Sequence, residues 1–342
     1  MRKLLTFVAV MLGLILWCAP PQAGQERAPR SAATPAALVP VPSPAVQAVV
    51  DEAAQAVLKK FADKGLKPEQ LSVTLVDLRD PQRAAAGSFR GNERVYPASV
   101  VKLFYLAAAH RWLEDGRLKD TEELRRALRD MIVDSSNDAT GYVLDVLTDT
   151  TSGRELPPEE MRAWLQKRNA VNRYFASLGY TNINTNQKTF CEDAYGRERF
   201  SRGPNGENRN KLTTDATARL LAEIATGRAV SAERSRQMMD LLKRDFAGTS
   251  TNTDDQAHGF TALALADAPA ARLWSKAGWT STTRHDAAYV ELPNGARFVL
   301  VTFTTDHANE RDIIPTVARV VLDKMKGEQV RSQESGARSQ NE

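Results

Sequence analysis

The sequence predicts an α/β fold of the α+β sandwich type: helices flank an antiparallel sheet built from both chain ends, and an all-helical lobe is inserted between them. Alternating apolar residues predict strands at 71–78 and 84–90, and strand signals resume only near Leu273. From residue 99 to about 221 the apolar spacing is helical instead. Clefts between two such lobes are common ligand sites.

The helices predicted along the chain follow from apolar residues that recur every three or four positions. The first covers residues 46–61, and Gly65 is its stop signal. The others carry the same spacing and together make up the predicted lobe, at residues 100–113, 121–133, 140–147, 158–178 and 214–224.

The N-terminus has the pattern of a targeting signal. Arg2 and Lys3 precede an apolar stretch from Leu4 to Trp17, and a small, Pro-rich exit ends near Ala23. This stretch is too short for a comfortable membrane span, so we expect export to the periplasm or beyond, without stable membrane insertion after signal cleavage.

The expected domain boundaries follow from shifts in composition. They are a signal peptide at 1–23, an Ala/Pro-rich linker at 24–44, one folded domain at 45–326 and a disordered polar tail at 327–342. Within the domain, the sheet lobe is expected at about 45–95 and 225–326, and the helical lobe at about 96–224.

The composition narrows the classes of function. The net charge of +4 is mild and acidic residues alternate with basic ones, which favours a solvated surface over nucleic-acid binding.

Cys18 follows the bulky Trp17, which argues against lipidation. If cleavage occurs near Ala23, Cys191 is the one cysteine left, and no intramolecular disulfide can form. The four histidines lack metal-ligand spacing, so neither metal nor cofactor is expected.

The most informative motif begins one of the predicted helices. Ser99 and Lys102 are three residues apart, so they share one face of a helix and can come within hydrogen-bond reach. A serine hydroxyl attacks carbonyl groups only when a base activates it, and a lysine deprotonated by burial is such a base.

Two further motifs follow downstream. Ser135-Ser136-Asn137 lies in a break between helical segments, and Lys276-Ala277-Gly278 precedes strand-like segments. In this order the three motifs resemble the S-x-x-K, S-D-N and K-T-G set of class A β-lactamases and penicillin-binding proteins. The resemblance extends from about residue 46 to 325, and includes a segment like the closing hairpin of the β-lactamase sheet, 283–303.

The resemblance implies a role for each motif residue. Ser99 would be the nucleophile and Lys102 its general base. Ser135 would relay a proton to the leaving nitrogen, and Asn137 would hold the substrate's amide. Lys276 would lower the pKa of Lys102 and attract a substrate carboxylate. The alternative for the two polar residues of the second motif is that they cap the following helix.

The resemblance also implies an oxyanion hole made by the backbone N–H groups of Ser99 and Trp279. Gly278 fits this position because a side chain there would crowd the substrate. A Ser-His-Asp triad through His285 and Asp286 is disfavoured, since neighbours on one strand point to opposite faces.

The chain departs from the family pattern in three ways. Ser136 and Ala277 replace the middle residues of two motifs, so a hydroxyl that would bind the substrate carboxylate is missing, and Thr280, Thr282 or Arg284 could replace it. The segment between the first two motifs is shorter than class A enzymes usually have. The E-x-x-L-N context of the water-activating glutamate is absent, and the candidates for that role are Glu192 and Glu198.

The sequence therefore predicts an exported serine hydrolase that forms an acyl-enzyme on Ser99, with β-lactam hydrolysis as its activity. Two alternatives stay open. One is a D-Ala-D-Ala peptidase or another cell-wall amidase, and the other is a catalytically silent scaffold that binds cell-wall peptides. The expected partner is a small molecule, either a β-lactam or a cell-wall peptide, and the oligomeric state is not predicted.

Overall fold

The computed structural model of the protein describes residues 37–190, 193–248, 250–252 and 254–338. The predicted signal peptide, most of the predicted linker, Cys191 and Glu192 lie outside these residues. No helix among the described residues is long and apolar enough to cross a membrane.

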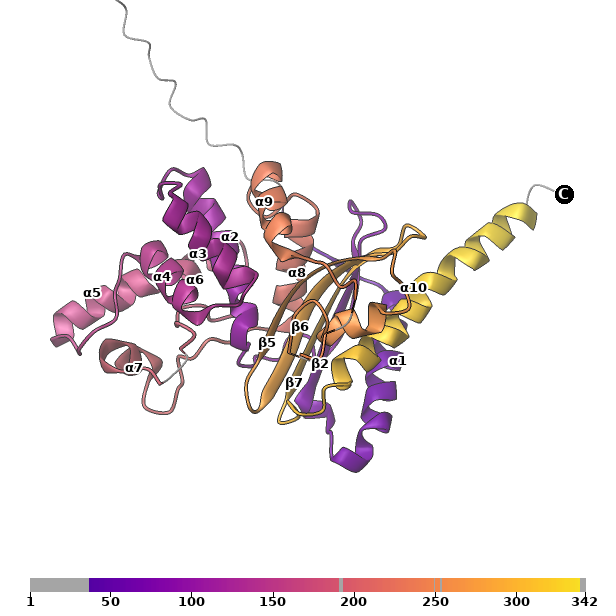
Figure 1. Ribbon diagram of the computed structural model, residues 1–342, viewed down its shortest axis with the longest axis horizontal. Coiled ribbons are helices and arrows are strands. Elements are labelled where there is room, and N and C mark those ends of the chain that lie inside the picture. Colours follow the sequence, from indigo (N-terminus) through magenta and orange to yellow (C-terminus); the bar gives the residue numbers. More distant parts are fainter. Residues whose placement is uncertain (1–36, 191–192, 249, 253, 339–342) are drawn as a thin grey trace, which may run out of the picture. The chain divides into compact units, whose positions relative to one another are not determined.

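A seven-stranded sheet forms the centre of the described chain (Figure 1). Its strands, in spatial order, are β1 (Val41–Pro42), β3 (Ala85–Phe89), β2 (Leu71–Asp77), β7 (Arg297–Thr305), β6 (Thr283–Glu291), β5 (Arg272–Trp279) and β4 (Lys243–Arg244). Every neighbouring pair is antiparallel except β1 and β3, which run parallel. The predicted assembly from both chain ends is confirmed, because β2 pairs with β7 along its whole length.

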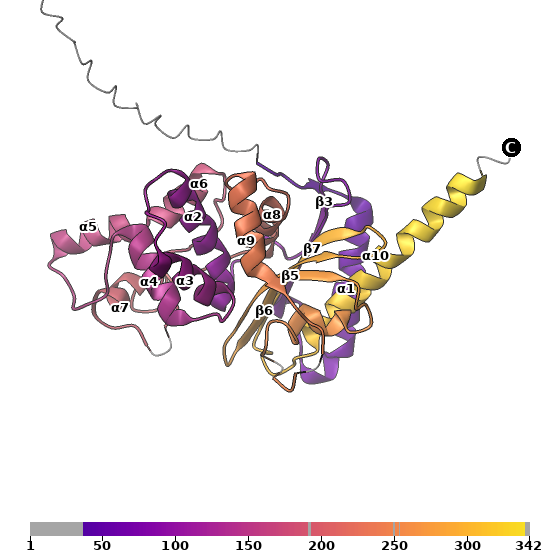
Figure 2. The same ribbon diagram turned by 45° about the horizontal axis from the view of Figure 1, so that its top comes forward.

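Helices cover both faces of the sheet (Figures 1 and 2). Helices α1 (Pro44–Lys60) and α10 (Ile313–Arg338) pack against each other on one face, while α8 (Thr214–Ala225) packs on the other, against β2, β6 and β7. Strand β7 shows why both faces are apolar: Phe298 and Leu300 face α1 and α10, whereas Val299 and Val301 face α8. Each residue along the strand thus joins the opposite core from its neighbour.

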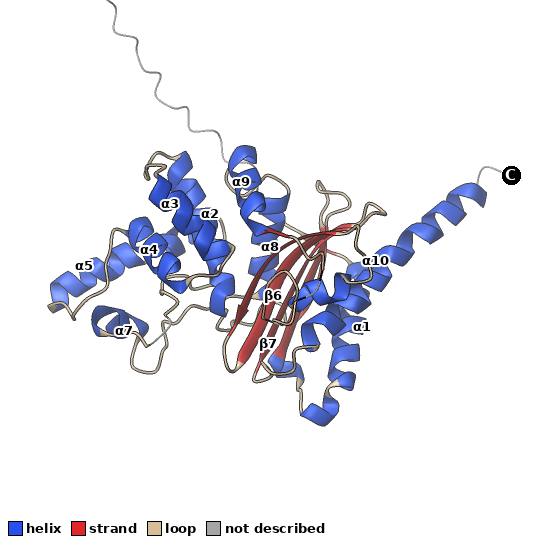
Figure 3. Cartoon of the chain, viewed as in Figure 1, coloured by secondary structure: helices blue, strands red, loops and turns tan. Residues whose placement is uncertain are grey.

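The helical lobe lies beyond α8 and α9 (Ala232–Leu242) (Figure 3). Its members are α2 (Lys102–Glu114), α3 (Glu122–Ile132), α4 (Asn137–Thr148), α5 (Pro158–Arg168), α6 (Ala170–Ser177) and α7 (Gly196–Arg202). Helix α2 is buried almost throughout and forms the axis of the lobe. The single helix expected at 158–178 is two helices, since Asn169, with φ −82° and ψ 12°, interrupts the helical backbone.

The domain boundaries differ in three places from those expected. Val41 and Pro42, at the end of the predicted linker, form a strand because their backbone pairs with Ala85 and Ala86. Helix α8 packs on the sheet although its sequence position lies in the predicted helical lobe. The backbone of α10 continues as a helix to Arg338, into the segment expected to be a disordered tail.

Candidate active site

The Ser99 turn is held against the sheet by two strands. Ser99 lies in the short 3-10 helix η3 (Ala98–Val101), which leads directly into α2. A methyl group at Gly278 on β5 would fall 2.7 Å from the Ser99 nitrogen, so the two backbones are in direct contact. On β6, the buried His285 donates from Nε2 to the Tyr96 carbonyl at 2.9 Å and accepts the Thr304 N–H on Nδ1. The strands thereby fix the backbone on both sides of the turn.

Lys102 is fully buried and reaches the second motif. Its Nζ donates to the Ser135 carbonyl at 2.5 Å and to Asn137 Oδ1 at 2.9 Å, and it lies 3.2 Å from Ser135 Oγ. Its backbone N–H donates to the Ser99 carbonyl, which places the two residues in one helical turn. The predicted base therefore joins the Ser99 turn to the loop before α4.

Ser136, the middle residue of the second motif, caps a helix. Ser136 is the N-cap of α4, and its Oγ accepts the Ala139 N–H at 3.1 Å. Ser135, at φ 57°, adopts the left-handed conformation. Because Ser136 provides the cap, the side chains of Ser135 and Asn137 are available to contact Lys102.

Lys276 approaches the same hydroxyl from the sheet. Its Nζ lies 3.0 Å from Ser135 Oγ, 2.8 Å from the Ala277 carbonyl and 2.6 Å from Gln256 Oε1. Burial lowers the pKa of Lys276 well below its ordinary value, and the positive charges of Lys102 and Arg244 lower it further. The Ser135 hydroxyl is therefore flanked by two buried amines.

The edge of β5 next to this cluster is open. Strand β4 pairs only with Leu273 and Trp274, so no strand in the described part of the chain lies beyond the later residues of β5. The Thr280 N–H donates to the Thr283 carbonyl, and hydrogen-bonded pairs alternate along an antiparallel ladder. The Trp279 N–H, one residue earlier, therefore points out of the sheet at the open edge, next to the Gly278 contact with Ser99.

Comparison with known proteins identifies the family. The model of the β-lactamase enzyme family matches residues 50–325. The chain belongs to the β-lactamase enzyme family. A search of curated proteins finds no match.

Solved structures of this family share the fold. A β-lactamase from Sphaerobacter thermophilus superposes with a TM-score of 0.60 at 20% identity, over 81% of this chain and 97% of that one. The structure of PBP-A gives 0.57 at 19%, over 84% and 99%, and a β-lactamase from Xanthomonas campestris gives 0.56 at 18%, over 80% and 98%. These structures show the fold, and the family match together with it identifies the protein as a serine hydrolase of the β-lactamase fold.

The residues expected to replace the missing carboxylate-binding hydroxyl have other partners in this β-lactamase family member. Ala277 is buried in a small cluster with Phe260 and Ile314, away from the Lys276 side of the strand.

The Arg284 guanidinium donates to Asp254 at 2.7 Å and stacks 3.8 Å above the Phe260 ring. Thr280 accepts the N–H groups of Thr282 and Thr283 in the β5–β6 turn. Arg284 in particular is 3% exposed at its side chain, and its charge is directed to Asp254.

Glu198 lies in a buried ion-pair network of the helical lobe. Both of its carboxylate oxygens accept from the Arg168 guanidinium, at 2.7 and 3.0 Å, and one also accepts from Ser152. Arg168 also reaches Asp145 on α4. Asp145 is eight residues beyond Asn137, about 12 Å along the helix. The structure therefore assigns Glu198 contacts that anchor α7, and brings it to none of the motif residues that it describes.

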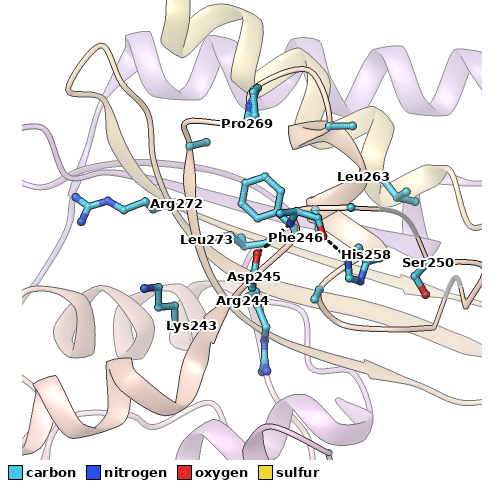
Figure 4. Close-up of a pocket in the computed structure, with 16 residues that line it drawn as sticks. Lys243, Arg244, Asp245, Phe246, Ser250, His258, Leu263, Pro269, Arg272 and Leu273 are labelled. Atoms are coloured by element: carbon cyan, nitrogen blue, oxygen red, sulfur yellow. Dashed lines mark hydrogen bonds between the residues drawn. The ribbon is translucent and has the colours of Figure 1, made fainter.

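Two buried residues near Lys276 escaped the sequence analysis. Arg244 borders a hollow of about 790 Å³ between β4 and residues 257–273, but its guanidinium points away from that hollow (Figure 4). It donates instead to the carbonyls of Ser275 and Ile132, and burial lowers its pKa to about 10. Gln256 contacts Lys276 directly. Neither residue has a motif around it, so spacing alone carried no signal for them.

Proposed function

We propose that the protein is an exported serine hydrolase that β-lactams acylate on Ser99. The observation that carries the proposal is the position of Ser135 Oγ, within 3.2 Å of the Lys102 amine and 3.0 Å of the Lys276 amine. Ser99 lies in the same helical turn as Lys102, and the Lys102 amine contacts Ser135, so the turn of the nucleophile, the base and the proton relay are joined.

Acylation then proceeds in two steps. Ser99 Oγ attacks the substrate's carbonyl carbon while its proton passes to Lys102, which acts as a neutral amine. The Ser99 N–H, in the first turn of a helix, and the Trp279 N–H at the sheet edge stabilise the oxyanion. When the C–N bond breaks, the Ser135 hydroxyl protonates the leaving nitrogen and recovers a proton from a neighbouring amine.

Lys276 supports this relay electrostatically. When it carries a proton, its charge disfavours a second charge on Lys102 and attracts an anionic substrate. Its low pKa means that the two amines need not both be charged. The relay can thus hold one mobile proton among Lys102, Ser135 and Lys276.

Release of the acyl group is the slow step in this proposal. The carboxylate of Glu198 is held by Arg168 and Ser152, so it is not available to activate a water molecule at the ester. Glu192 lies outside the described residues. We therefore expect a burst of about one equivalent of product, followed by slow turnover. The engagement of Glu198 by Arg168 and Ser152 also favours the second candidate function, a D-Ala-D-Ala peptidase or related cell-wall amidase that β-lactams trap.

Mass spectrometry of the intact protein tests these functions. The purified protein is incubated with a penicillin and with a chromogenic cephalosporin, and the adduct and product are followed by stopped flow. A lasting adduct on Ser99 supports a trapped acyl-enzyme, and sustained fast turnover supports an efficient β-lactamase. If neither adduct nor turnover appears, acylation by β-lactams is refuted and a binding scaffold is favoured.

Export is part of the proposal because the N-terminal pattern is that of a signal peptide. Expression of the full chain in a Gram-negative host, followed by fractionation, tests it. Cleaved protein in the periplasm or medium supports export. Uncleaved protein in the cytoplasm contradicts it.

A further inference from the structure

Gln256 links the two lobes at the active site. It lies between β4 and the 3-10 helix η4 (Phe260–Leu265), and is 7% exposed. Its Oε1 accepts from Lys276 Nζ at 2.6 Å and from the Ala277 N–H at 3.0 Å. Its Nε2 donates to the carbonyls that precede the second motif, those of Ile132 at 3.3 Å and Val133 at 3.0 Å.

We propose that Gln256 is a positioning residue that aims the Lys276 amine at Ser135 and so completes the proton relay. The proposal rests on the proposed acylation of Ser99 and extends it, because it names a residue outside the three motifs on which that chemistry depends.

The hydrogen-bonding positions of the Lys276 Nζ atom support this assignment. Gln256 Oε1 and the Ala277 carbonyl are both acceptors, so each takes one N–H of the amine. The remaining position on the nitrogen faces Ser135 Oγ at 3.0 Å. In the ammonium form this position donates a hydrogen bond to Ser135, and in the neutral form it is a lone pair that can accept the Ser135 proton.

The same side chain arranges the edge of β5. The N–H groups of Ala277 and Trp279 lie on the same edge, because successive residues alternate in direction along the ladder. Gln256 accepts the first of these donors. The donor that points from the edge toward the Ser99 turn is then that of Trp279, as the proposed oxyanion hole requires.

The charges around Lys276 determine what a change at Gln256 will do. Lys102 on α2 and Arg244 on β4 lower the pKa of Lys276, whereas Asp286 on β6 raises it. A carboxylate at position 256 would oppose the two cations and raise the pKa of the amine, by about one unit or more for a charge this close. Loss of the acceptor would have the opposite effect.

The turn that carries Gln256 also provides a matched control. On its other side, His258 Nδ1 pairs with Asp255 Oδ2 at 2.7 Å, and the ring borders the hollow shown in Figure 4. His258→Gln therefore weakens the same turn without touching Lys276.

The test compares Gln256→Glu, Gln256→Leu and His258→Gln in the purified full-length protein. The rate of acylation by a chromogenic cephalosporin is measured against pH, and the lysine ¹³Cε signals are titrated by NMR. We expect the Glu variant to move the acidic limb of the rate profile up by about one pH unit. The Leu variant should move it down and lower the plateau about tenfold, and the His258 variant should leave it in place.

Two results would overturn the proposal. One is an acidic limb that stays unmoved in Gln256→Glu, and the other is a shift that His258→Gln reproduces, since either would mean that Gln256 supports the turn alone. Should Gln256→Leu fail to fold, the Glu variant decides. If the wild type gives no adduct, the proposed function fails, whereas the NMR titration of Lys276 in Gln256→Glu still decides on the role of Gln256.

Discussion

Gly278 lies directly against the backbone of Ser99. A methyl group at position 278 would fall 2.7 Å from the Ser99 nitrogen, 2.8 Å from the Pro97 carbonyl oxygen and 2.9 Å from the Val100 nitrogen. All three atoms belong to the backbone, so no side-chain rotation can make room. The sequence analysis expected this glycine to make space for the substrate, whereas the structure shows that the nucleophile's own turn occupies the space.

We therefore predict that Gly278→Ala displaces the Ser99 turn and slows acylation by about two orders of magnitude, since a shift of about 1 Å in a catalytic group has effects of that size. Stopped-flow acylation with a penicillin measures this, with Ser99→Ala as the reference that forms no adduct. Gly327→Ala is the stability control, because a methyl group at this position on α10 would meet no atom within 4 Å. A normal rate in Gly278→Ala would contradict the close contact.

Lys102→Ala and Lys276→Ala should impair acylation in different ways. Loss of the Lys102 base should slow acylation of any substrate by about two to four orders of magnitude. Loss of Lys276 from the relay should slow acylation of any substrate less than loss of the base does, and its main effect should be weaker binding of substrates that carry a carboxylate. Acylation rates for paired acyl donors, with and without a carboxylate, separate the two roles. Equal losses on the donor without a carboxylate would show that the division of roles is wrong.

Glu198→Gln should destabilise the protein without changing the chemistry at Ser99. The change removes the fully buried carboxylate that pairs with the Arg168 guanidinium, 1% exposed, and leaves the guanidinium with Asp145 as its acidic partner; breaking such a buried pair costs about 3–5 kcal/mol. Chemical denaturation measures the loss, and Glu159→Gln, a change at a residue 90% exposed, is the control. If Glu198→Gln instead kept full stability and converted fast turnover into a trapped acyl-enzyme, Glu198 would be the water-activating group.

His110→Leu should stabilise the protein, most strongly in acid. The ring is buried on α2, and neither nitrogen has a hydrogen-bond partner among the described residues. Burial lowers the pKa of His110 to about 4. The unfolded chain therefore binds a proton more readily than the folded one, so stability falls as the pH drops from about 6.5 to about 4.

Replacement of His110 by leucine removes the cost of burying two unpaired ring nitrogens and the loss of stability in acid. The expected gain in the free energy of unfolding is about 1–3 kcal/mol at neutral pH, and about 2 kcal/mol more near pH 5. Urea denaturation at the two pH values measures the difference. A gain that is the same at both would show that the ring is not neutral in the folded state.

Sequence reasoning worked best where the contacts are local or periodic. Ser99 and Lys102 share a turn because residues three apart on a helix lie on one face, whatever the rest of the chain does. The strands of the sheet follow from alternation of apolar residues, since each face of the sheet packs on a separate core. The order of the three motifs indicated the family for the same reason, as each is a short local pattern.

The tertiary structure alone decided which polar residues serve the site. Gln256 contacts Lys276 across a turn, Arg284 pairs with Asp254, and Arg168 takes the carboxylate of Glu198. Residue type did not distinguish Glu198 from a catalytic glutamate or Arg284 from a free cation. A buried charge needs a partner, and which partner it meets depends on how the two lobes pack, a matter that no local spacing along the chain records.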